Sequence, residues 1–395
     1  MPLELTDLLM GSLLFVAIAI GWLLGRADRN KKTPFEEPPV IPREHFHGIN
    51  LLLNDKQDEA VEVFLRTLEI NEDTVDTYLV MGSLFRRRGQ VDRAIHIHQD
   101  LLARPSLNKQ QQTTVRLELA RDYLKAGLLD HSESILKELV GEGETHNTGS
   151  LEHLLSIYEQ EQDWHAAIST ASRLVGNSKQ DMTARLGQYH CEVAAKALQN
   201  NAMVEARSML KKALQHDKSC VRASLLSGQL EFEAQDYKKA IKALEQVRHQ
   251  DDDYLPEALD LLDKCYQALG QPQDYVKYLF TCLEHHSAVS IVLALSSRLD
   301  HVGGDHAGAA LLAQYLKRRP SARALHRLID FHIANSEGSA KENLSLLQDF
   351  TRQLISNKPV YRCNQCGFQG KSLHWHCPSC QTWGAVKPIH GLEGE

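Results

Sequence analysis

The sequence has few aromatic residues and no excess of positive charge. Aromatic residues make up 6% of its 395 residues, and the formal net charge is -7. Proteins that bind nucleic acids usually carry a basic surface, because contacts to phosphate dominate their affinity. The composition therefore disfavours a nucleic-acid partner. The low aromatic content, together with apolar residues at helical spacing, favours stacked helices over many short strands, so we expect an all-α fold.

Enzyme motifs and a disulfide framework are also missing. The sequence contains no glycine-rich phosphate-binding loop, no recognisable nucleophile motif and no histidine ligand pattern, which predicts that the protein is not an enzyme. The eight cysteines are too unevenly distributed for a disulfide framework. Those that lie singly in predicted helices are interpreted as buried small hydrophobic residues: Cys191, Cys220, Cys265 and Cys282.

One long uncharged run is present near the N-terminus, from Leu8 to Leu24. At about 1.5 Å per residue it nearly matches the thickness of a bilayer. A signal peptide would place basic residues before the run, whereas Glu4 and Asp7 precede it and basic residues follow from Arg26. We therefore expect an uncleaved transmembrane anchor in residues 1–25. Because Lys and Arg favour the cytoplasmic side, the N-terminus should face outward and the remaining chain should be cytoplasmic.

The middle of the chain repeats itself after a basic and proline-rich linker over residues 26–42. A 34-residue spacing separates corresponding small residues, and within a unit one small residue precedes another by 12. This spacing predicts helical hairpins whose two helices cross at the small residues, while a larger residue four positions on fills the neighbouring groove. The markers include Gly48 with Ala60, Gly82 with Ala94, Ala194 with Ala206, Gly228 with Ala240, and the larger residues Phe64, Leu210 and Leu244.

The period is less regular elsewhere. Ser132 follows Ala94 by 38 residues, and Ala206 follows Ala167 by 39, so extra length is expected in loops at 103–110 and 176–183. Beyond Asp251 the small-residue markers weaken although amphipathic segments continue. We expect about eight or nine hairpins over residues 43–357. The pattern resembles the tetratricopeptide repeat, whose helical solenoid offers a concave surface that can grip another protein or can serve as a spacer.

Four cysteines near the C-terminus form two Cys-x-x-Cys pairs separated by ten residues. Each tight turn can direct two thiolates toward one ion, so the spacing predicts a closed tetrahedral site that suits zinc or a single iron ion equally well. A full cysteine set leaves no open position for a catalytic water. The nearby His374 and His376 are expected to support the site rather than to bind metal. The predicted ligands are Cys363, Cys366, Cys377 and Cys380.

This metal knuckle is expected to form a small domain over residues 358–395. It is too short to bury much core of its own, so metal binding should supply much of its folding free energy. Gly367 should let backbone amides point toward the sulfurs, and Pro378 should stiffen the second turn. Four aromatic residues are expected to cover this small domain, namely Tyr361, Phe368, Trp375 and Trp383.

The order of anchor, repeats and the motifs YRCNQCGF and HWHCPSCQTWG resembles the family of lipopolysaccharide assembly protein B of the Gram-negative inner membrane. The resemblance covers essentially the whole chain and implies a rubredoxin-like C-terminal domain that packs against the repeats. It further implies a membrane-anchored adaptor that promotes degradation of the deacetylase committing precursors to lipid A. A membrane-bound ATP-dependent zinc protease would carry out that degradation. The family is also implied to organise other lipopolysaccharide assembly proteins.

Three other functions fit parts of the sequence. A rubredoxin-like iron site could transfer electrons. A generic membrane scaffold would need only the anchor and the repeats. A nucleic-acid-binding ribbon is disfavoured because Arg362, Lys371 and Lys387 are the only basic residues from Tyr361 onward. The sequence assigns no residues to a partner-binding surface.

Overall fold

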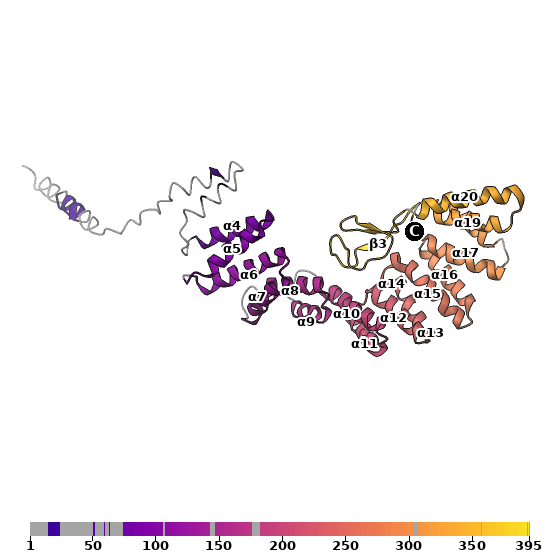
Figure 1. Ribbon diagram of the computed structural model, residues 1–395, viewed down its shortest axis with the longest axis horizontal. Helices are drawn as coiled ribbons and strands as arrows, with labels where there is room; N and C mark the ends of the chain where they lie inside the picture. The colour runs from indigo at the N-terminus through magenta and orange to yellow at the C-terminus, as the bar shows by residue number, and fades with distance from the viewer. Residues whose placement is uncertain are drawn as a thin grey trace, which may run out of the picture. The chain divides into compact units, whose positions relative to one another are not determined.

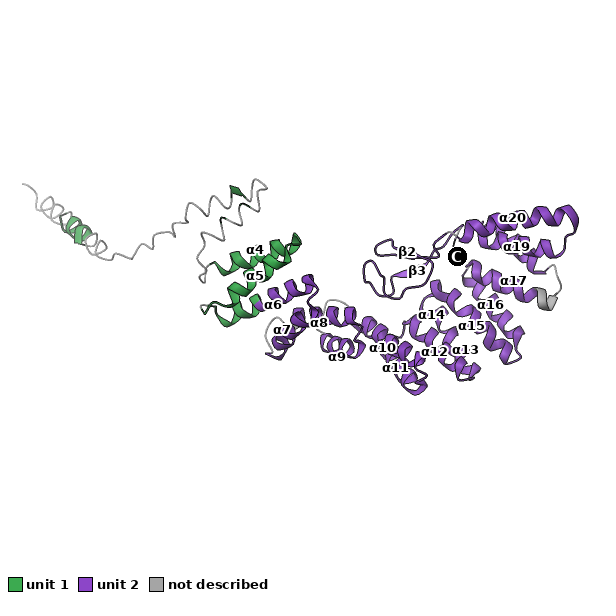
Figure 2. Ribbon diagram, in the orientation of Figure 1, with its two compact units in different colours: residues 1–115 green, residues 116–395 purple. Residues whose placement is uncertain are grey.

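The structure is a computed structural model that describes residues 15–23, 50, 51, 59, 63, 74–105, 107–142, 147–175, 182–286, 288–303, 307–356, 358–392 and 394 (Figure 1). It contains two compact units, residues 1–115 and residues 116–395, which Figure 2 distinguishes by colour. In the first unit, the principal helices are α4 (Val75–Arg87), α5 (Val91–Leu102) and the start of α6 (Lys109–Ala126), which continues into the second unit.

The second unit is a succession of helices followed by three short strands. Its helices after α6 are α7 (Leu129–Gly141), α8 (Asn147–Glu161), α9 (Trp164–Leu174), α10 (Met182–Gln199), α11 (Met203–His216), α12 (Val221–Glu233), α13 (Tyr237–Glu245) and α14 (Val247–Gln250). They continue with the 3-10 turn η1 (Asp252–Tyr254), α15 (Leu255–Ala268), α16 (Pro272–His285), α17 (Val289–Gly303), α18 (Ala307–Arg318), α19 (Ala322–Ala334) and α20 (Gly338–Ser356). The strands are β1 (Tyr361–Cys363), β2 (Gln369–Gly370) and β3 (Val386–Pro388).

The predicted membrane anchor is described only in part. Residues 15–23 form a helix whose large apolar side chains are exposed, and the rest of the run from Leu8 to Leu24 lies outside the described residues. Among the helices that the structure describes, none combines the length and the apolar character needed to cross a bilayer. The transmembrane anchor therefore stays a prediction. The linker at 26–42 and the markers Gly48, Ala60 and Phe64 also lie outside the described residues.

Successive hairpins turn in the same way. One or two residues after the first helix of a hairpin ends, the backbone has a positive φ, as at Gly89 (81°) and Gln235 (60°). At Gln235 its amide bonds the Phe232 carbonyl (2.9 Å), and the following amide, of Asp236, bonds the Glu231 carbonyl (2.8 Å). This Schellman arrangement satisfies carbonyls that the end of a helix leaves open. The same turn recurs at Gly127, Gln162, Asn201 and Gly270.

The small-residue markers lie where the helices of a hairpin cross, as the spacing predicts. A Cβ atom built on Gly228 would lie 2.4 Å from Cδ2 of Leu244, which is four residues beyond Ala240. In the first unit, a Cβ on Gly82 would lie 2.4 Å from ring atoms of His98, four residues beyond Ala94. Glycine is needed at both positions because the larger side chain occupies the space that a methyl group would take.

The irregular spacings between small-residue markers come from loops that connect one hairpin to the next. The turn within each hairpin keeps the same number of residues. Ser132 and Ala167 each follow their left-handed turn residue by five positions, as Ala94 does. The connections from α5 to α6 and from α9 to α10 take up the extra length, as predicted. Beyond Asp251 the equivalent position is Tyr275, which is buried and donates its hydroxyl to the Leu259 carbonyl at 2.9 Å. A large residue in the small-residue position explains why the marker pattern weakens there.

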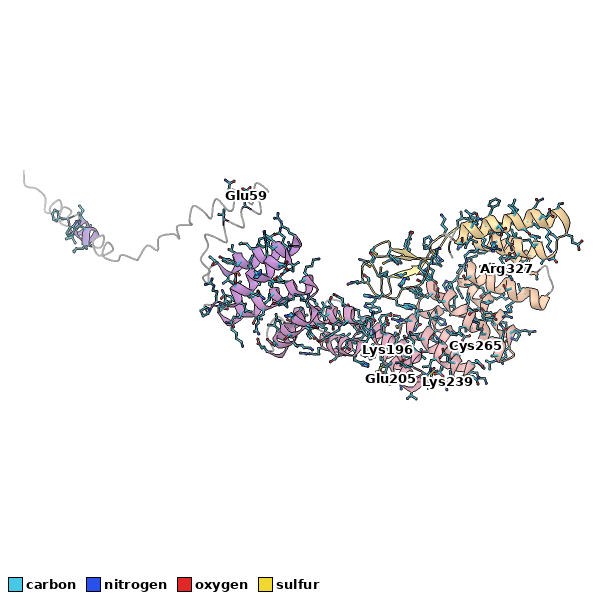
Figure 3. All side chains as sticks on the ribbon, in the orientation of Figure 1. Glu59, Lys196, Glu205, Lys239, Cys265 and Arg327 are labelled. Carbon is cyan, nitrogen blue, oxygen red and sulfur yellow. The ribbon has the colours of Figure 1, made fainter. Side chains whose placement is uncertain are left out.

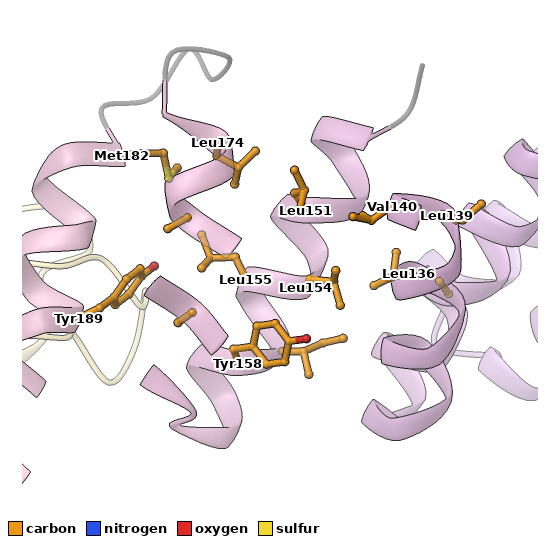
Figure 4. Close-up of a cluster of buried hydrophobic side chains, with 14 of the residues drawn as sticks. Leu136, Leu139, Val140, Leu151, Leu154, Leu155, Tyr158, Leu174, Met182 and Tyr189 are labelled. Atoms are coloured by element: carbon orange, nitrogen blue, oxygen red, sulfur yellow. The ribbon is translucent and has the colours of Figure 1, made fainter. Parts of the chain in front are cut away.

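Buried apolar side chains between neighbouring hairpins form the core of the second unit. Figure 4 shows one such cluster, in which Leu136, Leu155 and Leu174 are fully buried between α7, α8 and α9. The four cysteines outside the C-terminal motif are all buried, as expected for small hydrophobic residues. Cys265, labelled in Figure 3, is one of them. The fold is therefore mostly helical and of the tetratricopeptide type, as predicted.

The three strands form one antiparallel sheet in the order β2-β1-β3. Tyr361 pairs with Gly370 on one side, and Cys363 pairs with Val386 on the other. The sheet is very small, and its buried core consists of Cys363, Cys377 and Val386. Two of these three residues carry sulfur, so apolar packing alone supplies little of what holds this segment together.

Candidate metal centre and its seat on the repeats

The structure brings the four predicted cysteines together. Their Sγ atoms all lie within 4.8 Å of one another. Two sulfur pairs are 3.7 Å apart. Four sulfurs bound to one ion at about 2.3 Å would be separated by about 3.8 Å in a regular tetrahedron. The observed cluster therefore fits one metal ion, with either zinc or iron suited to the donor set: Cys363, Cys366, Cys377 and Cys380.

Two similar turns position the sulfurs. In the first, the Gly367 amide donates to the Cys363 carbonyl at 3.0 Å and Gly367 has a φ of 79°. In the second, the Gln381 amide donates to the Cys377 carbonyl at 2.9 Å and Gln381 has a φ of 55°. Glycine adopts this backbone region without strain, so Gly367 suits the turn. Both turns aim a pair of sulfurs at a common point.

Hydrogen bonds to sulfur favour the thiolate form that a metal needs. The hydroxyl of Thr382 lies 3.3 Å from Sγ of Cys380, and this hydrogen bond lowers the pKa of the Cys380 thiol to about 6. The Phe368 amide similarly lowers the pKa of Cys366. Burial has the opposite effect at Cys377, whose pKa is raised to about 11. Cys366 and Cys380 would therefore lose their protons before Cys377.

Neither neighbouring histidine joins the sulfur cluster. Nε2 of His374 lies 3.2 Å from the Ser372 hydroxyl, and Nε2 of His376 lies 2.8 Å from the Gln381 carbonyl. The His376 ring also stacks on Trp383, with ring centroids 4.4 Å apart. Both residues therefore support the knuckle through contacts outside the sulfur cluster, in agreement with the sequence analysis.

The four aromatic residues expected to cover the knuckle divide into two pairs. Tyr361 and Phe368 pack against the sulfur-bearing core. Trp375 and Trp383 instead pack against two different apolar clusters of the helical repeats. Because the knuckle has so little apolar interior, its tryptophans bury more surface against the repeats than they could within the knuckle. The second unit therefore contains both the knuckle and the surface that receives it.

The first contact of this seat is centred on Trp383. Its indole N–H donates to Glu159 Oε1 at 2.9 Å, and its ring meets those of Trp164 and Tyr189 edge to face at 5.9 and 5.8 Å. Glu159 also accepts from Arg185 at 2.8 Å and from the Tyr189 hydroxyl at 2.6 Å. Burial alone would raise the pKa of Glu159, but these donors outweigh it and hold the pKa below its usual value.

The second contact is centred on Tyr254, at the end of η1. Its hydroxyl donates to the Val386 carbonyl at 2.8 Å, and its ring stacks on Trp375 at 5.2 Å. The Arg222 guanidinium also lies over the Trp375 ring, 6.0 Å from the ring centre. The indole of Trp375 therefore lies against one residue on each of two neighbouring helical hairpins. A hydrogen bond from the Tyr254 hydroxyl to the backbone of strand β3 and an aromatic stack hold the knuckle at this point.

The third contact is ionic. Lys387 Nζ lies 2.8 Å from a carboxylate oxygen of Asp251 and 2.8 Å from one of Asp253. His390 approaches the other oxygen of Asp253 at 3.0 Å. Nearby, the Tyr361 hydroxyl donates to Glu257 at 2.5 Å. No sequence motif marks these repeat residues, because they lie more than a hundred positions from their partners.

Comparison with known proteins agrees with this architecture. Residues 197–265 match the family described as tetratricopeptide repeat, and residues 361–388 match the family described as rubredoxin metal binding domain. The chain is therefore a tetratricopeptide-repeat protein with a C-terminal rubredoxin-type metal-binding domain. A solved tetratricopeptide repeat protein from Parabacteroides merdae covers 71% of the chain, and the chain covers 99% of it, at 15% identity and a TM-score of 0.32.

Curated relatives place the chain more narrowly. Lipopolysaccharide assembly protein B of Escherichia coli strain K12 is 37% identical over 385 residues, which is 97% of this chain and 98% of the relative. The protein of the same name from Haemophilus influenzae is 35% identical over 96% of this chain and 98% of its own length. The chain belongs to the lipopolysaccharide assembly protein B family. The family resemblance inferred from the sequence motifs is confirmed.

Proposed function

We propose that this protein is a membrane-anchored cytoplasmic adaptor that limits lipopolysaccharide synthesis. It would bring the deacetylase that commits precursors to lipid A to a membrane-bound ATP-dependent zinc protease, which degrades it. It would also organise other lipopolysaccharide assembly proteins at the bacterial inner membrane. Family membership over 97% of the chain is the observation that carries the proposal.

The architecture supports a role in binding rather than in chemical catalysis. The repeats supply a long succession of helices that other proteins can contact. The cysteine cluster, with four sulfurs around one point, leaves no open coordination position when all four bind one ion. In this proposal Cys363, Cys366, Cys377 and Cys380 are the metal ligands, and the ion keeps the knuckle in the shape that fits its seat.

The proposed anchor adds an effective-concentration effect. An apolar helix in the bilayer confines the adaptor to the same surface as the protease, so weak contacts with protease and substrate suffice for their encounter. The exposed apolar side chains of the helix at residues 15–23, such as Phe15 and Trp22, support insertion into lipid. The segment from Leu8 to Leu24 would be the anchor.

The test compares the half-life of the deacetylase in cells that express either the full chain or a form that starts after residue 42, at matched levels. We expect rapid turnover with the full chain and slow turnover with the anchor-free form. An unrelated single-pass helix fused before residue 43 should restore turnover if confinement is its role. Equal turnover with and without any anchor would contradict the confinement mechanism. Failure to crosslink the protease or the deacetylase to the full chain in intact membranes would contradict the adaptor function itself.

A further inference from the structure

Two cysteines outside the metal centre touch each other across neighbouring hairpins. Cys191 lies within α10, and Cys220 is the residue immediately before α12. Their sulfur atoms are 3.8 Å apart, and the two residues are 0% and 2% exposed. The sequence suggests only two unrelated buried thiols, because 29 residues separate them. In the fold they form a dithiol.

The surroundings of Cys220 favour its thiolate. Cys220 occupies the N-terminal cap position of α12, where unpaired amide groups stabilise negative charge. The side-chain amide of Gln188 donates to its sulfur at 3.7 Å. The hydrogen bond shared by the two thiols lowers the pKa of Cys220 and raises that of Cys191. The two sulfurs are therefore chemically unequal, with Cys220 the better nucleophile.

Cys220 also borders a cavity. The cavity has a volume of about 510 Å³, and its wall includes Gln188, Asp217 and Ser219 from the repeats and Thr382 from the knuckle. Cys191 is fully buried within α10. A reagent of the size of water or hydrogen peroxide that enters this cavity meets Cys220, and Cys191 then lies within reach of the product.

We propose that Cys191 and Cys220 are a peroxide-sensitive pair that closes to a disulfide between α10 and α12. The Cys220 thiolate attacks one oxygen of hydrogen peroxide, the O–O bond breaks, and the departing hydroxide takes the proton that Cys220 released and becomes water. Cys220 is then a sulfenic acid. The sulfur of Cys191 attacks the Cys220 sulfur, the S–S bond forms, the S–O bond breaks, and hydroxide leaves with the Cys191 proton as a second water. The two thiols lose two electrons, which reduce the peroxide.

The closing movement is small. The sulfurs must approach from 3.8 Å to about 2.05 Å, which rotation of two side chains can share. The bond would join the α10–α11 hairpin to the α12–α13 hairpin. Trp375, Trp383 and Tyr254 line the same cavity, so the cross-link lies beside the seat of the knuckle. This inference is independent of the proposed adaptor function.

Cys265 provides the matched control within the chain. It is fully buried in a helix of the same array, and burial raises its pKa to about 11. If buried thiols in this protein react by chance during local opening, Cys265 and Cys220 should oxidise at similar rates. If the pair is built for oxidation, Cys220 should react much faster and should yield a specific cross-link.

The experiment uses the full chain purified with its metal in mild detergent. Hydrogen peroxide is added, remaining thiols are alkylated after denaturation, and the digest is searched for linked peptides that contain Cys191 and Cys220. We expect this cross-link to form at least about tenfold faster than any modification of Cys265. Persistence of both thiols at doses that oxidise Cys265, or equal rates at Cys220 and Cys265, would overturn the proposal. This measurement needs no variant, so it does not depend on whether a substitution folds.

Two substitutions then test which sulfur attacks. In Cys191→Ala, the Cys220 sulfenic acid has no partner and should be captured by dimedone, with a mass increase on the Cys220 peptide. In Cys220→Ala, Cys191 should stay a thiol under the same treatment. Capture of dimedone on Cys191 in the second variant would contradict the assigned order of attack. Retained helical circular dichroism in both variants confirms that each chain is folded.

Discussion

The repeats and the knuckle are held together by different forces. In the repeats, each hairpin buries aliphatic side chains against its neighbour, and close crossings such as that of Gly228 with Leu244 fix the geometry. In the knuckle, the buried core is two cysteines and one valine. Two of its large side chains, those of Trp375 and Trp383, pack outward on the repeats. The repeats can therefore fold by apolar burial, whereas the knuckle depends on metal and on its seat.

The difference has a functional consequence. A domain stabilised by an ion and by an external seat can be released without unfolding the array that holds it. The array offers a large surface for partners, and the knuckle covers part of that surface at Glu159, Tyr254 and Asp253. Changes at the sulfur cluster should thus affect the knuckle and its seat, while changes at hairpin crossings should affect the repeats. The four predictions that follow separate these two regions.

The largest effect is expected from loss of a cysteine of the buried side of the cluster. Cys377→Ser should abolish metal binding and unfold the knuckle, because a structural tetrathiolate site contributes on the order of 10 kcal/mol. Helical circular dichroism at 222 nm should hardly change, since the repeats do not use the ion. Metal content measures the loss of the ion, and tryptophan fluorescence measures the unfolding of the knuckle. Cys265→Ala is the control and should keep its metal. Loss of the helical signal in Cys377→Ser would show that the repeats and the knuckle are not stabilised separately.

The next largest effect is expected at the seat. Trp383→Ala removes the ring that packs edge to face on Trp164 and Tyr189, and it removes the donor to Glu159. Docking of the knuckle should weaken by about 3 kcal/mol. Metal should remain bound. Limited proteolysis between α20 and β1 should become faster in Trp383→Ala. Trp383→Phe keeps a ring but loses the N–H, so its cleavage rate should lie between those of wild type and Trp383→Ala.

Val204→Ala is the control for the general effect of shortening a side chain in the repeats. Val204 is 82% exposed on α11, so its loss should leave the cleavage rate unchanged. If Trp383→Ala and Val204→Ala are cleaved at the same rate, the contacts of Trp383 do not hold the knuckle in place.

A smaller effect is expected within the repeats. In Gly228→Ala the new methyl group meets Leu244 at 2.4 Å, so the hairpin must adjust at a cost of about 1–3 kcal/mol. Gly141→Ala is the matched control, because a Cβ there meets nothing within 4 Å. Thermal unfolding should show a lower Tm for the first variant and an equal or higher Tm for the second. Similar melting of both would show that the close crossing does not constrain the fold.

The smallest effect is expected from pH. Because the folded pKa of Glu159 lies below its usual 4.5, its stabilising effect is present in full above pH 4.5 and is lost as pH falls through the folded pKa. Glu159→Gln should therefore weaken docking near neutral pH, on the order of 1 kcal/mol. Urea titration at a series of pH values measures the difference from wild type, which should stay constant from pH 7 to pH 4.5 and shrink as the pH falls further. A difference that does not shrink below pH 4.5 would rule out ionic stabilisation by Glu159.

The sequence was informative where structure repeats locally and uninformative where distant parts meet. Small residues at fixed spacing predicted the crossings at Gly82 and Gly228, and paired cysteines predicted the sulfur cluster. In each case all residues of the signal lie within one helical hairpin or one small domain. The contact of Trp383 with the repeats was not predicted. Its partner Glu159 is 224 residues away, and an indole near a metal motif looks the same whether it turns inward or outward.

The degenerate repeats show the same limit. Tyr275 replaces the small residue expected at a hairpin crossing, and its hydroxyl finds the Leu259 carbonyl. Tertiary packing accepts the larger side chain once it has a hydrogen-bond partner, and no local pattern reports this. The contact between Cys191 and Cys220 was likewise invisible, since each cysteine alone looks like a buried hydrophobic residue.

Hydrogen exchange of the full chain, compared with and without bound metal, tests most directly whether the ion holds the knuckle on its seat. Chelation should expose the amides of 361–388 and should also speed exchange at the contacted ends, around Glu159 in α8 and around Tyr254 in η1. Exchange in α4 should not change. Protection of β1 and β3 that survives removal of the metal, or a seat that exchanges at the same rate in both states, would contradict the account.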